Sequence, residues 1–193
     1  DNPSQRLPVV TYALIAANVA AFLYEQSLGP GMRPLFVQWG VVPYRVIASL
    51  VGDGSLTAQM TTVFTSLFLH AGWLHLIGNL WYLWIFGDNV EDRLGHTAFL
   101  AFYLASGVIA AIMHAALVAD SVVPTVGASG AIAGVLGAYA FAFPRAKVLT
   151  LVPLIVFFKV VSLPAMFVLG LWFVFQFISG ALSTSRSEEH TSE

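Results

Sequence analysis

Five windows of the chain contain no Asp, Glu, Lys or Arg, and charged or turn-rich segments separate them. Each window is dominated by apolar residues, and a membrane-spanning helix needs about 20 such residues in a row. We therefore predict five transmembrane helices, at about 7–24, 71–87, 97–119, 129–143 and 163–182. This pattern predicts an all-α fold for a polytopic membrane protein.

Two of the connecting segments are expected to lie at the membrane surface. Residues 26–62 are rich in Gly and Pro and also contain Trp39 and Tyr44. Aromatic residues among turn signals are typical of an interfacial loop with short helices at the level of the lipid headgroups. Residues 148–158 are apolar but too short to span a bilayer, so we expect them to be interfacial as well.

The end of the chain differs sharply from the rest in composition. Residues 183–193 read STSRSEEHTSE and contain no apolar side chain. We interpret residues 1–182 as the membrane domain and residues 183–193 as a polar tail. The tail is either a native terminus or a translated cloning sequence, and the sequence leaves both interpretations open.

Composition excludes several classes of protein. Hydrophobic residues make up 58% of the chain and charged residues 9%, against about 45–50% and about 25% in ordinary globular proteins. Such a chain could not cover the surface of a soluble enzyme, and its 15 Phe and 5 Trp exclude a disordered segment. A net charge of −2 gives no argument for a nucleic-acid partner. Without cysteine there is no disulfide, thiolate metal site or Cys nucleophile.

The distribution of Lys and Arg predicts the topology. Five basic residues fall on one side of the predicted spans and three on the other: Arg6, Arg93, Arg145, Lys147 and Lys159 against Arg33, Arg45 and Arg186. Cytoplasmic loops carry the excess of basic residues. We therefore expect a cytoplasmic N-terminus, an outward-facing 26–62 loop and, for a bacterial protein, a location in the inner membrane.

Polar residues occur on one face of the second predicted helix. His75 and Asn79 are four residues apart, and His70 precedes them. A polar side chain inside a membrane is a functional-site hypothesis by default, because its burial in hydrocarbon is unfavourable. The structural alternative is that these side chains hydrogen-bond neighbouring helices. The sequence leaves the two readings open.

A second polar feature is the sequence Gly127-Ala128-Ser129-Gly130, followed by Gly134 and Gly137. Structurally, Ser is a favoured N-cap and the glycines form a close-packing face. However, residues 129–143 make only about 22 Å of helix against a hydrocarbon core of about 30 Å. Ser129 would then lie below the outer surface, after non-helical backbone at 122–126 that must be buried in protein or line a wet cavity. A hydroxyl at such a helix N-terminus, beside free N–H groups, is in a nucleophile's environment.

A third feature is the charged turn that contains Glu91, Arg93 and Gly95. We interpret it as scaffold: a helix end with glycine turns and an ion pair at the membrane interface.

Together, these motifs resemble the rhomboid intramembrane serine proteases, in particular the bacterial ones. The resemblance covers about residues 7–182 and rests on motifs that occur in the family's order and spacing: His70, His75-xxx-Asn79, Glu91-x-Arg93-x-Gly95, Gly127-Ala128-Ser129-Gly130, and Leu163-Pro164 with 169–173. The Gly-Ala-Ser-Gly motif alone is a weak signal, whereas its combination with His-xxx-Asn about fifty residues upstream is specific.

The resemblance implies a role for each matching residue. Ser129 matches the nucleophile of a Ser–His dyad. His75, Asn79 and the N–H of Ser129 match the oxyanion hole. Glu91 and Arg93, like Gly127, Gly130 and Gly134, match structural motifs. The family has a six-helix core and uses no metal and no cofactor, and its partners are the lipid bilayer and single-span transmembrane substrates.

The sequence departs from the family at the general base. The family places this histidine on a sixth helix, which would also pack against the Gly130, Gly134 and Gly137 face. None of the chain's five histidines fits that position. We therefore interpret the chain as a rhomboid-like bundle with five of the usual six helices, and expect it to be inactive as given, since a Ser without its base is a poor nucleophile.

Three classes of function remain to be compared. The first is a serine endopeptidase that cleaves transmembrane-helix substrates. The second is a non-catalytic rhomboid-like protein that binds membrane helices, although such a relative usually loses Ser129, His75 or Asn79 as well. The third is a transporter or channel, which would predict internal repeats that the sequence lacks.

Overall fold

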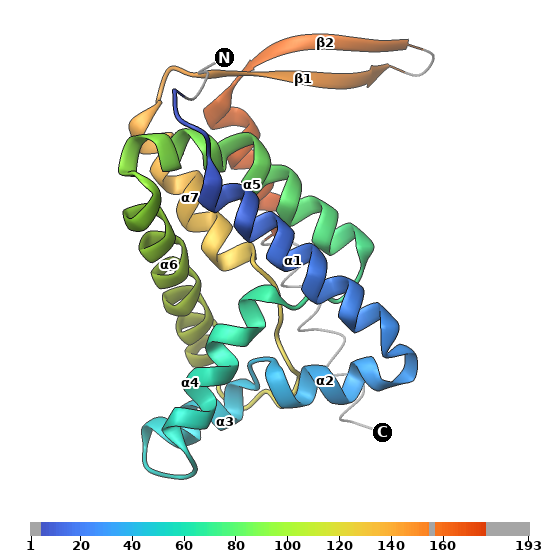
Figure 1. The fold of residues 1–193 in the computed structure, drawn as a ribbon, viewed down its shortest axis with the longest axis vertical. Coiled ribbons are helices and arrows are strands. Elements are labelled where there is room, and N and C mark those ends of the chain that lie inside the picture. Colours follow the sequence, from blue (N-terminus) through green and yellow to red (C-terminus); the bar gives the residue numbers. More distant parts are fainter. Residues whose placement is uncertain (1–4, 155–156, 177–193) are drawn as a thin grey trace. The chain divides into compact units, whose positions relative to one another are not determined.

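The computed structural model describes residues 5–154 and 157–176. It forms two compact units, the first ending at Val135 and the second beginning at Leu136. The first unit holds six α-helices and the start of a seventh (Figure 1): α1 (Val9–Ser27), α2 (Met32–Trp39), α3 (Pro43–Leu50), α4 (Leu56–Thr65), α5 (Trp73–Leu94), α6 (His96–Leu117) and α7 (Ser129–Ala142). Two short 3-10 helices, η1 (Gly29–Gly31) and η2 (Ser66–Phe68), join them.

The prediction of an all-α helical membrane protein is confirmed. By length and composition, α1 and α6 can each cross a bilayer. The pair Leu56–Phe68 and Trp73–Leu94 is bent by 82° and counts as a third candidate if it is taken as one broken span. The helices Ser129–Ala142 and Ala165–Gln176 are apolar but shorter. The count of five spans therefore stays a prediction.

The helix ends differ from the expected windows where charged residues continue a helix. The second predicted helix, at 71–87, runs in fact from Trp73 to Leu94, because Asp88 and its charged neighbours form its last two turns. The predicted start at Ser129 coincides with the start of α7. The last window, at 163–182, begins later, at Ala165, and its residues 177–182 lie outside the described part of the chain.

The segment after α7 contains a feature that the sequence analysis did not predict. Strands β1 (Lys147–Leu154) and β2 (Phe157–Pro164) form an antiparallel hairpin in which Lys147 pairs with Pro164 and Leu151 with Val160. An apolar run of this length is compatible with a helix or a strand, and periodicity alone does not separate the two. Pairing lets each strand satisfy the backbone groups of the other.

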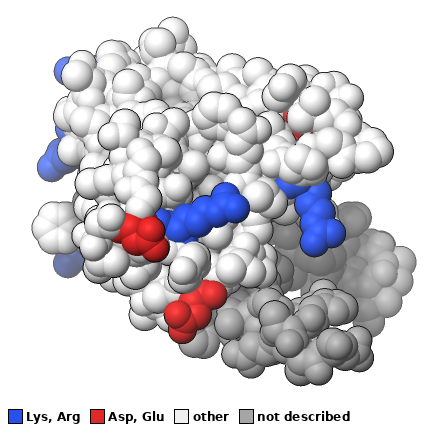
Figure 2. Space-filling model, turned by 90° about the horizontal axis from the view of Figure 1, so that it is seen from below, with Lys and Arg blue, Asp and Glu red and all other residues white. Residues whose placement is uncertain are grey.

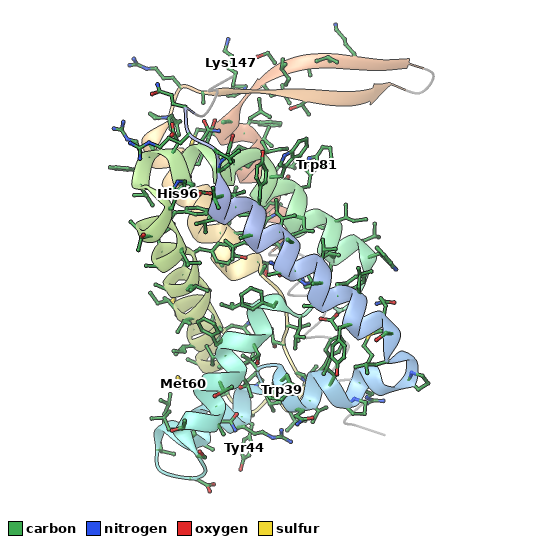
Figure 3. All side chains as sticks on the ribbon, viewed as in Figure 1. Trp39, Tyr44, Met60, Trp81, His96 and Lys147 are labelled. Atoms are coloured by element: carbon green, nitrogen blue, oxygen red, sulfur yellow. The ribbon has the colours of Figure 1, made fainter. Side chains whose placement is uncertain are left out.

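The core of the first unit is apolar and continuous with the loop helices. Helix α1 packs on α5, and α3 and α4 pack on α6. Val41, Val46, Val63 and Ala115 form a buried cluster that joins the 26–62 region to α6. Trp39 and Tyr44, labelled in Figure 3, are exposed on the helices of this region.

Helices α6 and α7 approach each other through glycines. A Cβ placed on Gly130 would lie 2.6 Å from the Cβ of Ala110, and one on Gly134 would meet the Ser106 side chain. The expected partner of this glycine face was a sixth helix, and that expectation is wrong for Gly130 and Gly134, because α6 already occupies their side of α7. Gly137, one turn further on, is exposed.

Replacing Gly130 by Ala should therefore destabilise the protein by about 1–3 kcal/mol, as expected for overpacking of a close contact. The matched control is Gly78→Ala on α5, where an added Cβ has no described atom within 4 Å; its stability should be unchanged or slightly higher. Equilibrium unfolding in mixed detergent micelles measures both. Equal stabilities of the two variants would contradict the close α6–α7 packing.

Candidate active site

The backbone that leads into α7 is non-helical, as the sequence predicts for residues 122–126. Three points of contact hold it. Thr125 exchanges two backbone hydrogen bonds with Val41, of 2.7 and 3.0 Å. The N–H of Tyr44 donates to the carbonyl of Ser121, at 3.0 Å. The N–H of Gly127 donates to the carbonyl of Ser66, at 2.9 Å.

Gly127 brings this loop against the polar face of α5. Its φ is +131°, which only glycine adopts readily. A Cβ at this position would lie 2.6 Å from Cε1 and 2.7 Å from Nε2 of His75, and 3.8 Å from Nδ2 of Asn79. The loop can approach these two side chains only because residue 127 has none. The structure thus places the turn before Ser129 directly on His75 and Asn79.

Hydrogen-bond donors surround this turn. Asn79 is buried, and its Nδ2 has no hydrogen-bond partner among the described residues. Ser129 is the first residue of α7, so the N–H groups of that first turn have no partner within the helix. A negatively charged oxygen bound here would receive donors from both elements. Donors of this kind are the groups from which oxyanion holes are built.

A buried carboxylate that the sequence analysis missed supports the polar face. Glu25 of α1 is fully buried and accepts a hydrogen bond from the N–H of His70, with 3.1 and 3.3 Å to its two oxygens. The buried His70 ring packs edge-on against the His75 ring, with centroids 5.2 Å apart. Glu25 therefore holds the backbone at His70, whose ring packs against His75.

One signal in the sequence could have indicated that Glu25 is buried. The buried residues of α1 are Thr11, Leu14, Asn18, Phe22 and Glu25, which are three or four residues apart. Side chains at this spacing share one face of a helix. Glu25, which directly follows the apolar window predicted at 7–24, lies on this buried face.

Glu91 has a structural role, but its partners differ from those expected. The side chain that meets Glu91 at this turn is His96, whose Nδ1 lies 2.6 Å from a carboxylate oxygen of Glu91. Arg93, two residues further along α5, is exposed, since residues i and i+2 of a helix do not share a face. Figure 3 labels His96, close to the start of α1.

Glu91 also caps the N-terminus of α1. Its oxygens accept hydrogen bonds from the N–H of Val10 (2.9 Å), the N–H of Thr11 (2.7 Å) and the hydroxyl of Thr11 (2.7 Å). The N–H groups of a first helical turn have no intrahelical acceptor, and a carboxylate there is favourable. Glu91 thereby joins α1 to α5.

The remaining described histidine also touches the loop before α7. Nε2 of His114, on α6, lies 3.2 Å from the hydroxyl of Thr125, four residues before Ser129. His190 lies outside the described residues. In the described part of the chain, no three His, Asp or Glu side chains are grouped in the manner of metal ligands.

The chain is similar in sequence to known proteins of one family. The profile of the Rhomboid domain matches residues 57–188. Rhomboid protein 1, mitochondrial, of Saccharomyces cerevisiae is 31% identical over 147 residues, which are 74% of this chain and 39% of that protein. Rhomboid protease GluP of Bacillus subtilis is 35% identical over 132 residues, 68% of this chain and 24% of the relative. A third relative, presenilin-associated rhomboid-like protein A, mitochondrial, of Danio rerio, is 36% identical over 95 residues, 48% of this chain and 25% of its own length.

The apolar helices and the polar residues between them define a helical integral membrane protein. The chain belongs to the rhomboid family. This family includes serine intramembrane proteases. The relatives that match this chain include mitochondrial as well as bacterial proteins. The matched regions make up less than half of each of these three relatives.

Replacing Glu91 by Ala should destabilise the protein by at least about 2 kcal/mol, because buried donors of α1 lose their acceptor. The matched control is Asp92→Asn. The neighbouring Asp92 carboxylate accepts one exposed hydrogen bond, from the N–H of Gln5 at 3.1 Å, and its replacement should cost about 0.5 kcal/mol or less. Thermal unfolding in detergent compares the two, and a loss no larger for Glu91→Ala than for Asp92→Asn would contradict the capping role.

Proposed function

We propose that this protein is an intramembrane serine protease whose nucleophile is Ser129. Its substrates would be single-span transmembrane helices, cleaved near the outer membrane surface. The protein would be located in the bacterial inner membrane, with its N-terminus in the cytoplasm. The observation that carries the proposal is the contact of Gly127 with His75 and Asn79. Gly127 is two residues before Ser129, which begins α7, and both His75 and Asn79 carry polar hydrogens.

In the proposed reaction, the hydroxyl of Ser129 attacks the scissile carbonyl and forms an acyl-enzyme. The oxygen that becomes negative would be bound by the N–H of Ser129, Nδ2 of Asn79 and the ring of His75. A histidine would take the hydroxyl proton and return it to the leaving amine, and water would then hydrolyse the ester. The family resemblance assigns that histidine to a sixth helix.

The alternative is a non-catalytic rhomboid-like protein that binds membrane helices. One observation favours it: in the described part of the chain, His96 and His114 are engaged with Glu91 and Thr125. The two proposals differ in one measurable property, the reactivity of Ser129 once a sixth helix with its histidine is present.

The first test uses the chain extended by a sixth transmembrane helix with an Ala-His motif, reconstituted with a single-span substrate. Ser129→Ala should lower turnover by several orders of magnitude. Asn79→Ala should lower it by about 10²–10³-fold, as for one oxyanion donor. The matched control is Asn89→Ala, a buried asparagine of the same helix about 15 Å further along it, which should leave turnover near that of the parent. Equal turnover in Ser129→Ala would refute the serine mechanism.

The second test uses the 193-residue chain itself with a serine-directed fluorophosphonate. We expect no labelling of Ser129, because no described histidine matches the base and an unactivated hydroxyl reacts slowly. If Ser129 is labelled, the variant His114→Ala identifies the source of activation, since His114 contacts the loop before α7. Labelling that His114→Ala abolishes would show that the dyad is formed with α6.

A further inference from the structure

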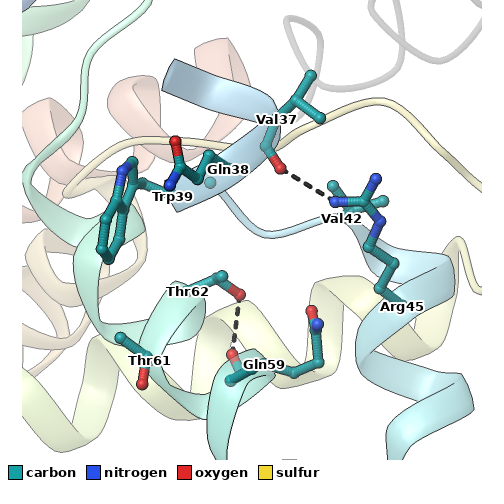
Figure 4. Close-up of a pocket in the computed structure, with 10 residues that line it drawn as sticks. Val37, Gln38, Trp39, Val42, Arg45, Gln59, Thr61 and Thr62 are labelled. Atoms are coloured by element: carbon teal, nitrogen blue, oxygen red, sulfur yellow. Dashed lines mark hydrogen bonds between the residues drawn. The ribbon is translucent and has the colours of Figure 1, made fainter. Parts of the chain in front are cut away.

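The 26–62 region contains a cavity that has no part in the proposed chemistry. It lies between α2, α3 and α4 and has a volume of about 270 Å³. The polar or aromatic side chains that line it are Gln38, Trp39, Arg45, Gln59, Thr61 and Thr62 (Figure 4). Helices of this region are expected at the level of the lipid headgroups.

The cavity offers hydrogen-bond donors and one positive charge. Nη1 of Arg45 donates to the carbonyl of Val37 at 3.1 Å (Figure 4), and its other N–H groups have no bond to any described residue. The carboxamides of Gln38 and Gln59 are likewise without a partner in the described part of the chain. A guanidinium and two amides can together surround a phosphate group.

No described Asp or Glu side chain forms an ion pair with Arg45. The residues that line the cavity include no Asp or Glu, and Arg45 has no carboxylate within 4.0 Å among the described residues. Figure 2, which views the molecule from below, shows few charged side chains on a largely uncharged surface. An anion is the ligand that such a cavity favours.

A second cavity, almost entirely apolar, shares the lining residue Trp39 with the first. It has a volume of about 260 Å³ and is lined by Tyr24 of α1, Leu35 of α2, and Phe68 and Leu69 before α5. Trp39 is a lining residue of both cavities, one rich in hydrogen-bond donors and the other apolar. A ligand that fills both must have an anionic group next to a hydrocarbon chain.

We propose that the two cavities bind one phospholipid molecule, with its phosphate at Arg45 and an acyl chain against Leu35 and Phe68. Trp39 lies at the junction, where the amphipathic indole is favoured at the boundary between headgroups and hydrocarbon. Inorganic phosphate would use only the first cavity, and a neutral diacylglycerol only the second. The proposal does not depend on protease activity.

The test is native mass spectrometry of the purified chain with dioleoyl phosphatidylglycerol. Arg45→Gln should weaken lipid binding by about tenfold or more, since charge-assisted hydrogen bonds to the phosphate are lost. The matched control is Arg33→Gln, an exposed arginine of the same loop that lines neither cavity; it should bind as the parent does. Arg45→Lys, which keeps the charge but not the fork of donors, should lie between the two.

Two further arms identify the ligand. Leu35→Asn should weaken lipid binding while leaving the affinity for inorganic phosphate unchanged, because it changes only the apolar cavity. Diacylglycerol should bind at least about tenfold more weakly than the phospholipid, and equally to the parent and Arg45→Gln. Thermal unfolding identifies variants that fail to fold. If Arg45→Gln is one of them, the lipid affinity of Arg45→Lys tests the site instead. If Arg45→Gln and Arg33→Gln weaken lipid binding equally, the proposed site is wrong. If Arg45→Gln weakens phosphate binding but Leu35→Asn leaves lipid binding unchanged, the ligand is not a phospholipid that occupies both cavities.

Discussion

Backbone groups outside helices must find hydrogen-bond partners in the protein when no water is available, and this constraint governs how the chain enters α7. In this segment, backbone groups of Ser121, Thr125 and Gly127 bond to residues of the loop and helices between α1 and α5: Tyr44, Val41 and Ser66. The loop region is therefore part of the site. Without it, the turn that presents Ser129 would leave its amides and carbonyls unbonded, at a cost of several kcal/mol for each group in hydrocarbon.

Two buried carboxylates tie α1 to the two ends of α5. Glu91, near the end of α5, caps the first turn of α1, and Glu25, near the end of α1, binds the N–H of His70 shortly before α5 begins. A hydrogen bond to a charged acceptor such as the Glu91 carboxylate is worth about 1.5–3 kcal/mol. Helix α5, which carries His75 and Asn79, is thus held at both ends, and its polar face has little freedom to turn away from Gly127.

Local sequence accounts for much of the candidate site. The i, i+4 spacing puts His75 and Asn79 on one face, and the preference of helices for a polar residue at their start puts Ser129 at the beginning of α7. These properties depend on a few consecutive residues. The contact between the two elements does not, because Gly127 and His75 are about fifty residues apart, and only the resemblance to a family pointed to it.

The sequence by itself determined the apolar composition, the helical class and the polar residues that a membrane protein retains at a site. Only the tertiary structure decided which groups these residues meet: His96 rather than Arg93 beside Glu91, α6 rather than a further helix beside Gly130, and a hairpin at Lys147–Leu154 where an apolar run allowed either a helix or a strand. The physical reason is that hydrophobicity and helix periodicity act over neighbouring residues. Hydrogen-bond partners and close contacts depend on segments that folding brings together from distant parts of the chain.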